Sequence, residues 1–249
     1  MKEKEILVSI ITVVFNGEKT ISRTIESVLN QTYPHIEYII QDGISEDHTL
    51  EIANSYQEQF RQKDIAYQVV SEKDDGIYDA MNRGIKKAQG KIIGMINADD
   101  WYEKDAVEKV VGFYEKTHFD LMYGDLRIVK NTGETQIKHS RFRNYITTRD
   151  WNHPTTFVKK AVYQKYHYAC ENLYDDFDFL LRIRNLNYRV CILNEVLANF
   201  SLGGVSNEKK LHKALERAKI RYTIYRKNGY SPFYFFESYG HELLKYLIT

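Results

Sequence analysis

The chain repeats one unit four times within its first 116 residues. Each unit has a short run of β-branched and apolar residues, a polar cluster, and a stretch with apolar residues at helical spacing. The apolar runs predict strands at 6–15, 36–41, 65–70 and 91–96, and the stretches between them predict helices at 19–30, 47–60, 77–88 and 104–116. Consecutive strand–helix units predict an α/β fold with an open, mostly parallel sheet flanked by helices, because right-handed crossovers place the helices on its faces.

Every predicted strand ends in a polar cluster. The clusters are Asn16-Gly17, Asp42-Gly43, residues 71–76 and residues 97–100. In open parallel sheets, ligands bind beyond the carboxyl ends of the strands. The order of the sequence therefore predicts a binding site along this edge of the sheet.

The pattern changes after residue 120. A hairpin is expected first, followed by short mixed elements, a glycine loop and two helices. These elements span 121–129 and 135–139 (hairpin), 155–158 and 189–197 (strands), 160–165 and 175–185 (helices), Gly203-Gly204 (loop), 207–228 and 230–249 (helices). We expect one domain over 1–205, with halves 1–119 and 120–205, and a C-terminal helical extension over 206–249.

Composition narrows the class of protein. The 249 residues, 43% hydrophobic and 28% charged, suit a globular protein with a sizeable core, and a net charge of +1 argues against nucleic acid as a partner. No apolar run reaches the roughly 18–20 residues of a membrane span, and the N-terminus lacks a signal-peptide cleavage site. Cys170 and Cys191 lack metal-ligand spacing, so we expect reduced core or subsurface thiols in a cytoplasmic protein.

Adjacent carboxylates are the strongest chemical signal. Asp99 and Asp100 follow the fourth predicted strand, where like charges repel unless one shifts its pKa or a cation binds. A hard divalent metal would remove the repulsion, whereas Asp100 could instead cap the next helix. Asp42, at the second strand end, could bind a base or ribose, or simply belong to an Asp-Gly turn.

Further acidic residues begin two predicted helices. Asp79 and Asn82 are site candidates, although acids in a first helical turn are also favoured by the helix dipole. Asp175 and Asp176 open the 175–185 helix, where a carboxylate can serve as a general base or as a cap. Asp178, one turn in, is expected to be solvated or salt-bridged.

Trp151 and His153 are candidates for contact with a second substrate. His153 follows Trp151-Asn152 and precedes both Pro154 and a predicted strand. A lone histidine also often has a purely structural role, and that alternative stays open.

The 207–228 helix carries eight Lys or Arg against two Glu. Its apolar stripe consists of Leu211, Ala214, Leu215, Ala218, Tyr222 and Tyr225. With the aromatic residues at 233–236, this helix could lie on an anionic membrane surface. Equally, the stripe could pack on the core and leave the charges solvated.

Taken in order, these motifs resemble family-2 glycosyltransferases with a GT-A fold, of the single-domain bacterial type. The similarity runs from about Val8 to Leu181 and rests on SIITVVFNGEKTISRTIESVLNQTYPHIEYIIQDGISEDHT, SEKDDGIYDAMNRGIKKAQGKIIGMINADD and DDFDFLLRI. The resemblance implies that Phe15, Asn16 and Glu18 cradle a nucleotide and that Asp42 reads its base.

By the same resemblance, Asn97-Ala98-Asp99 matches the family's Asp-x-Asp motif. Asp99 would be the metal ligand, with Asn97 and Asp100 beside the donor. Asp176 matches the catalytic base, and Asp175 replaces the Glu that usually precedes it. Two further departures are Met81, where many members carry Arg, and the absence of the Gln-x-x-Arg-Trp motif of processive synthases.

The resemblance implies an inverting transferase that uses Mn²⁺ or Mg²⁺. Its donor half (1–119) would bind a nucleotide-sugar, by family default a UDP-sugar carrying a hexose or N-acetylhexosamine. Its acceptor half (120–205) would bind a saccharide or lipid-linked saccharide for cell-surface polysaccharide synthesis, in the cytoplasm or at the inner membrane face. The alternatives are a sugar nucleotidyltransferase, a two-carboxylate glycosidase and a non-catalytic sugar-nucleotide-binding relative.

Overall fold

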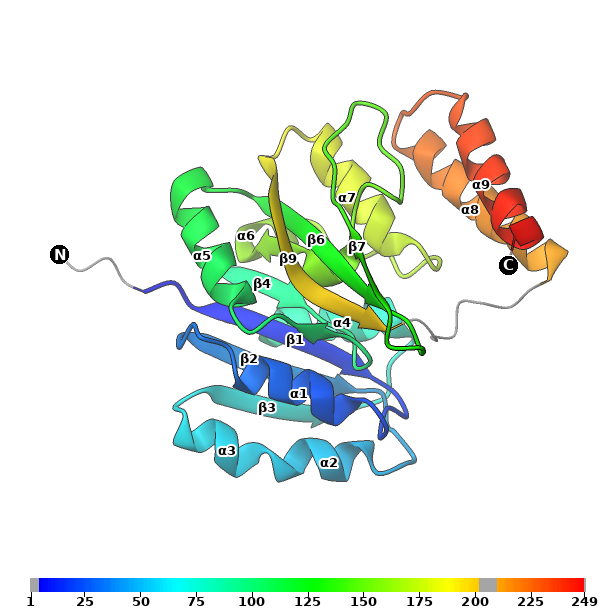
Figure 1. Cartoon of the computed structure of the whole chain (residues 1–249). Helices are drawn as coiled ribbons and strands as arrows, with labels where there is room; N and C mark the ends of the chain where they lie inside the picture. Colours follow the sequence, from blue (N-terminus) through cyan, green and yellow to red (C-terminus); the bar gives the residue numbers. More distant parts are fainter. Residues whose placement is uncertain (1–4, 202–209, 249) are drawn as a thin grey trace.

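Four parallel strands form one half of the central sheet. β1 (Val8–Val14) lies between β2 (Ile36–Asp42) and β4 (Ile92–Met95), and β3 (Ala66–Ser71) pairs with β2. The computed structural model describes residues 5–201 and 210–248 (Figure 1). The observed strands match the four predicted apolar runs, and the expected α/β fold with a mostly parallel open sheet is confirmed.

The other half of the sheet is mixed. β8 (Phe157–Lys159) runs antiparallel between β4 and β6 (Leu121–Val129), and β6 pairs in parallel with β9 (Val190–Ser201). β7 (Thr135–Lys138) completes the predicted hairpin with β6, and β5 (Trp101–Tyr102) pairs with β9. The order among the described residues is β3-β2-β1-β4-β8-β6-β9-β5, with β7 beside β6.

Helices cover both faces of the sheet. Figure 1 shows α1 and α5 in front of it, and α8 and α9 together at one side, far from β3. The bounds are α1 (Ile21–Leu29), α2 (Thr49–Ser55), α3 (Gln57–Gln62), α4 (Ile77–Lys87), α5 (Ala106–Thr117), α6 (Lys160–Tyr163), α7 (Asp175–Asn185), α8 (Leu211–Lys227) and α9 (Tyr234–Ile248).

Alternation along β1 separates two hydrophobic cores. Val8 and Ile10 pack into the core that contains α1 and α5, whereas Ile11 and Val13 pack into the core that contains α4 and α7. Successive side chains of a strand point to opposite faces, so an apolar run of this kind needs cover on both sides. This burial on both faces explains why the first predicted strand is almost continuously apolar.

Several predicted boundaries were wrong. The 47–60 helix is two short helices, because the chain turns at Tyr56. Residues 153–155 form a 3₁₀ turn, and the strand expected at 155–158 begins at Phe157. The short strand β5 was missed, since its two residues are ordered only by pairing with β9. The predicted Gly203-Gly204 loop lies outside the described residues.

Gly90 lies between α4 and β4 and packs closely against the start of β1. α4 ends at Lys87, and Ala88 is its C-cap. A Cβ on Gly90 would lie 2.5 Å from the backbone nitrogen of Ser9 and 2.8 Å from the carbonyl oxygen of Leu7. The turn before β4 therefore contacts β1 so closely that only glycine fits.

The C-terminal helices are joined by a buried ionic network. Arg221 of α8 was expected to be solvated if the helix packed on the core, but it is 1% exposed and pairs with Glu242 of α9. Glu242 also accepts a 2.9 Å hydrogen bond from Nε of Arg217. Burial would raise the pKa of Glu242, but bonding to His241 and Arg217 and the charge of Arg221 lower it to about 2. Among the described residues, no helix is long and apolar enough to span a bilayer.

Replacing Gly90 by Ala should destabilise the fold. The added methyl meets backbone atoms that cannot rotate away, so we expect a loss of about 1–3 kcal/mol in the free energy of unfolding, measured by urea denaturation. Gly112→Ala is the matched control: Gly112 lies in α5 with open space around its Cβ, and Ala should stabilise that helix by up to about 1 kcal/mol. Equal effects at both positions would contradict the packing argument.

Removing the charge of Glu242 should cost far more than removing that of an exposed acid. Glu242→Gln leaves Arg221 buried without its main counter-ion, and we expect a loss of about 3–5 kcal/mol in the free energy of unfolding. Glu58→Gln, in the exposed pair with Arg61, should change stability little. An Arg221→Met, Glu242→Leu double variant should recover much of the lost stability. If Glu242→Gln lowers the free energy of unfolding no more than Glu58→Gln does, the network does not stabilise the fold as we expect.

Candidate active site

The loops after β1 and β2 are joined by hydrogen bonds at the predicted edge of the sheet. The N–H of Asn16 donates to Oγ of Ser45 (2.8 Å), and Oδ1 of Asn16 accepts from the N–H of Glu46 (2.8 Å). The Glu18 carboxylate accepts from the N–H of His48 (3.1 Å). These bonds hold the two loops together, and we call Phe15, Asn16 and Glu18 at this edge the braced rim. Phe15 is 63% exposed.

Asp42 lies beneath this rim and is almost fully buried. Its carboxylate accepts from the N–H and hydroxyl of Ser45 (3.1 and 2.5 Å) and from the hydroxyl of Ser71 (2.6 Å). An ionised carboxylate has about four lone-pair sites. Three donors already bond to the Asp42 carboxylate, so it can accept about one more hydrogen bond from a ligand.

Asp99, at the end of β4, has the most available carboxylate of this edge. It is partly exposed, and within the described residues its side chain makes no hydrogen bond or ion pair. Its backbone carbonyl instead accepts from Arg23 (2.8 Å), which stacks on Trp101 at 3.7 Å. Arg23 was not among the predicted residues, because in sequence it is one more polar position on α1.

Asp100 is buried and differs sharply from its neighbour. Burial first, and then the charge of Asp99, raise its pKa to about 8. Its Oδ1 accepts from the N–H of Ser201 (3.3 Å), and Oδ2 has no partner among the described residues. This raised pKa favours the neutral form of Asp100, which lowers the repulsion between the two carboxyl groups. The capping alternative is wrong, since α5 begins at Ala106 after Asp105.

The side chains of Asp79 and Asn82 are engaged within the protein. Asp79 pairs with Arg83 (2.9 Å), and the Asn82 amide donates to the Tyr168 carbonyl (2.9 Å) and to Sγ of Cys170 (3.4 Å). Both amide hydrogens of Asn82 are thus used to hold the 168–170 segment. Cys170 is exposed, so its predicted place in or just below the core was wrong; Cys191 is partly buried.

α7 begins with three acids in different environments. Asp175 is buried and caps the preceding turn by accepting from the N–H of Glu171 (2.7 Å) and from Asn172 (2.9 Å). Asp178 is buried rather than solvated, bonded to Asn228 (2.6 Å) and 3.5 Å from Lys227. Asp176 is only partly buried; its carboxylate accepts from the N–H of Phe177 (2.7 Å) and also interacts with the Tyr78 hydroxyl.

Aromatic hydroxyls from distant parts of the chain surround Asp176. Burial raises the pKa of Tyr78, Tyr163 and Tyr168, and the charge of Asp176 adds to each shift. Tyr78, on α4, donates to the carbonyl of Leu173 (3.1 Å) and fixes the turn before α7. These tyrosines were missed, because nothing in their local sequence separates them from core tyrosines.

His153 and Trp151 complete this side of the site. Burial lowers the pKa of His153, against the opposing effect of nearby Asp176. Trp151 is buried, donates to Oγ1 of Thr156 (2.8 Å) and lies edge-on to His153 at 5.7 Å between ring centroids. Trp151 therefore positions the segment, and His153 is close enough to Asp176 for the charge of that carboxylate to oppose the lowering of its pKa.

The oxygen atoms at the end of β4 fit a metal that is only partly held by protein. No group of three or more His, Cys, Asp or Glu side chains within 5–201 and 210–248 is placed to bind a metal. Mg²⁺ and Mn²⁺ often take one or two carboxylates and complete their shell with water and substrate phosphates. The unbonded carboxylate of Asp99 and the partnerless buried Oδ1 of Asn97 fit that ligand set.

The chain is similar to glycosyltransferases in sequence. It is 36% identical over 107 residues to the putative teichuronic acid biosynthesis glycosyltransferase TuaG of Bacillus subtilis, covering 43% of this chain and 41% of the relative. It is also 36% identical over 126 residues to the PGL/p-HBAD biosynthesis glycosyltransferase of Mycobacterium bovis, covering 50% and 48%. The matched region therefore spans less than half the length of these curated relatives.

Solved structures share the fold at low identity. The UDP complex of S. aureus TarS superposes with a TM-score of 0.68 at 17% identity, covering 98% of this chain and 72% of that one. Mannosyltransferase PcManGT from Pyrobaculum calidifontis, in complex with GDP-Man and Mn²⁺, gives a TM-score of 0.68 at 17% identity, covering 99% and 71%. Residues 9–172, more than half of the chain, match the family described as Glycosyl transferase family 2. The protein therefore belongs to glycosyl transferase family 2 and has the GT-A fold.

Proposed function

We propose that this enzyme transfers a sugar from a UDP-sugar to an acceptor hydroxyl with inversion at the anomeric carbon. The observation that carries the proposal is the difference in burial and bonding among its aspartates. Of the aspartates at the site, Asp99 and Asp176 are only partly buried, whereas Asp42, Asp100 and Asp175 are buried and bonded within the protein.

The donor would bind along residues 1–119. The braced rim of Phe15, Asn16 and Glu18 and the remaining acceptor site of Asp42 suit a nucleoside, and the solved relatives bind UDP, UDP-GlcNAc or GDP-Man. When bound, a divalent metal would be held by Asp99 with Asn97 beside it, and would offset the negative charge of the diphosphate. Asp79, Asn82 and Asp100 are better suited to supporting this region than to touching the donor.

The acceptor would bind on the side of residues 120–205, where Asp176 acts as general base. Its carboxylate takes the proton of the acceptor hydroxyl while that oxygen attacks the anomeric carbon. The bond from this carbon to the diphosphate oxygen breaks, and its electron pair leaves with the diphosphate. Burial lowers the pKa of His153, which disfavours its cationic form beside Asp176.

The named relatives favour a role in cell-surface glycan synthesis. TuaG is named for teichuronic acid biosynthesis and the mycobacterial enzyme for PGL/p-HBAD biosynthesis. We therefore propose a saccharide or lipid-linked saccharide as the acceptor and the cytoplasm as the place of reaction. Family membership favours this activity over the nucleotidyltransferase and glycosidase alternatives.

Asp176→Asn should separate catalysis from binding. Without the base, we expect turnover of the UDP-sugar to fall about 10²–10⁴-fold, while UDP affinity measured by calorimetry stays unchanged. Glu171→Gln, an exposed acid just before α7, is the control and should keep wild-type turnover. A variant Asp176→Asn with near-normal turnover would remove Asp176 from the role of base.

Asp99→Ala should weaken metal-dependent donor binding. We expect UDP affinity in the presence of Mn²⁺ to fall at least about tenfold, with a much smaller change when EDTA is present, because Asp99 contributes through the metal. Asp105→Ala removes a nearby carboxylate that pairs with Lys109 and should leave both affinities unchanged. If wild type binds UDP equally with and without metal, the metal-dependent proposal fails.

A further inference from the structure

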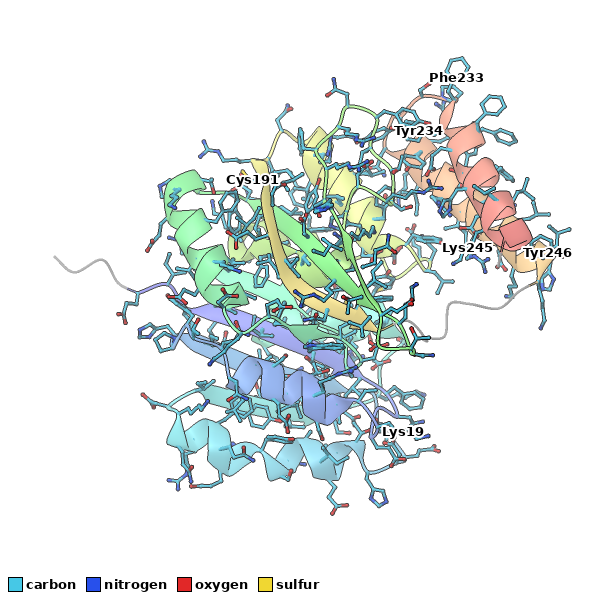
Figure 2. The ribbon with its side chains drawn as sticks, in the orientation of Figure 1. Lys19, Cys191, Phe233, Tyr234, Lys245 and Tyr246 are labelled. Carbon is cyan, nitrogen blue, oxygen red and sulfur yellow. The ribbon has the colours of Figure 1, made fainter. Side chains whose placement is uncertain are left out.

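α9 carries its polar side chains inward and its apolar side chains outward. Tyr234, Ser238 and Glu242 are buried against the rest of the chain, within 3% exposure. The outward residues are Phe233 (72% exposed), Phe235 (43%), Phe236 (70%), Leu243 (38%), Leu244 (51%) and Tyr246 (41%). In Figure 2 the Phe233 ring projects away from the chain at the start of α9. A surface helix normally has the opposite arrangement, because apolar side chains gain by leaving water.

The ionic network fixes this arrangement. Glu242 is held by Arg221 and Arg217 of α8, and Tyr234 stacks on Tyr145 at 4.4 Å between ring centroids. Turning α9 to hide its phenylalanines would pull Glu242 away from two arginines. The outward apolar face is therefore held in place by the fold.

α8 extends the same apolar surface. Leu211 and Leu215 are 45% and 41% exposed, and Tyr222 meets Phe235 edge-on at 5.7 Å. The rest of the stripe expected on α8 packs inward, since Ala214, Ala218 and Tyr225 are buried. Contiguous apolar surface of this kind marks a site of interaction.

A basic pocket adjoins this face. About 400 Å³ lies between the 141–150 segment and α9, lined by Phe236 and Leu244 from the apolar face and by Arg141, Arg143 and Arg149. Arg143 is 3.5 Å from Asp150, which offsets its charge. Among the described residues, the side chains of Arg141 and Arg149 make no ion pair or hydrogen bond, although the charge of Arg149 acts to lower the pKa of Glu237.

The remaining acids of the pocket do not cancel these arginines. Asp150 accepts from Thr147 and pairs with Arg143, and Glu237 lies 3.9 Å from Arg221. Burial also raises the pKa of Glu237, which lowers its tendency to carry charge. Two guanidinium groups are thus left beside exposed phenylalanine and leucine.

We propose that α9 and the arginine pocket dock the enzyme on an anionic membrane surface. The outward Phe and Leu side chains enter the lipid interface, and Arg141 and Arg149 bind lipid phosphate groups. Apolar side chains for the acyl boundary and cations for headgroups are the two contributions that hold amphipathic helices on anionic bilayers.

Vesicle co-sedimentation tests the apolar part of the surface. Wild type should bind mixed phosphatidylcholine–phosphatidylglycerol vesicles, and Phe236→Ser with Leu244→Ser should lower the partition coefficient at least about tenfold. Ile137→Ser with Leu186→Ser, two exposed apolar residues elsewhere (45% each), is the control and should bind as wild type. UDP calorimetry on every variant monitors the donor site separately, so loss of vesicle binding with intact UDP binding concerns docking alone.

A second pair of variants tests the charges. Arg141→Gln with Arg149→Gln should weaken binding to mixed vesicles about tenfold, and high salt should weaken wild type similarly. Neither change should affect binding to vesicles made of phosphatidylcholine alone. Lys86→Gln with Lys116→Gln, both exposed and distant from the pocket, is the control.

Three results would overturn the proposal. Wild type that binds neither kind of vesicle would exclude a lipid surface. Binding of inorganic pyrophosphate that requires Arg141 and Arg149, without vesicle binding, would assign the pocket to a soluble anion. A dimer seen by light scattering without lipid, and lost in the Phe236→Ser, Leu244→Ser variant, would assign the apolar face to a second copy of this chain.

Discussion

The parallel register of β1, β2 and β3 is the constraint on which the active site depends. Val14 pairs with Asp42, and Asp42 pairs with Ser71, so three strands end level with one another. Their loops can therefore bond to each other within a few residues of leaving the sheet, as Asn16 does with Ser45. A shift of one residue would turn Asp42 to the other face of the sheet and separate it from both serines. The binding edge is thus a consequence of backbone hydrogen bonding, before any ligand is considered.

Several acids lie at this edge of the sheet, and burial places them in different environments. Asp100 and Asp175 are each bonded to backbone N–H groups of a neighbouring segment. Asp99 and Asp176 are only partly buried. A buried carboxylate is stable only when it is protonated or well bonded, so it is a poor ligand or base unless a substrate replaces its partners. The roles proposed for these acids follow from their different environments.

The C-terminal helices follow a different physical rule from the sheet domain. The core strands and helices bury their apolar faces, whereas α9 buries Glu242 against Arg221 and leaves phenylalanines in water. A buried ion pair contributes little net stability but strongly penalises orientations that break it. In this protein it sets the rotation of α9. The apolar surface that this rotation exposes is not covered by other described residues, which is why we relate it to a membrane surface outside the protein.

The sequence by itself determined the strand–helix order, the α/β fold and the polar edge, because periodicities of 2 and 3.6 are local properties of the chain. Those local patterns also located the acids of the site. Tertiary structure alone decided that α2 and α3 separate at Tyr56, that β5 exists, and that Arg221 is buried. It also decided which acids are free and which tyrosines surround Asp176. These outcomes depend on partners about 20 to 100 residues away, as with Asp100 and Ser201 or Tyr78 and Leu173, and no local pattern encodes such contacts.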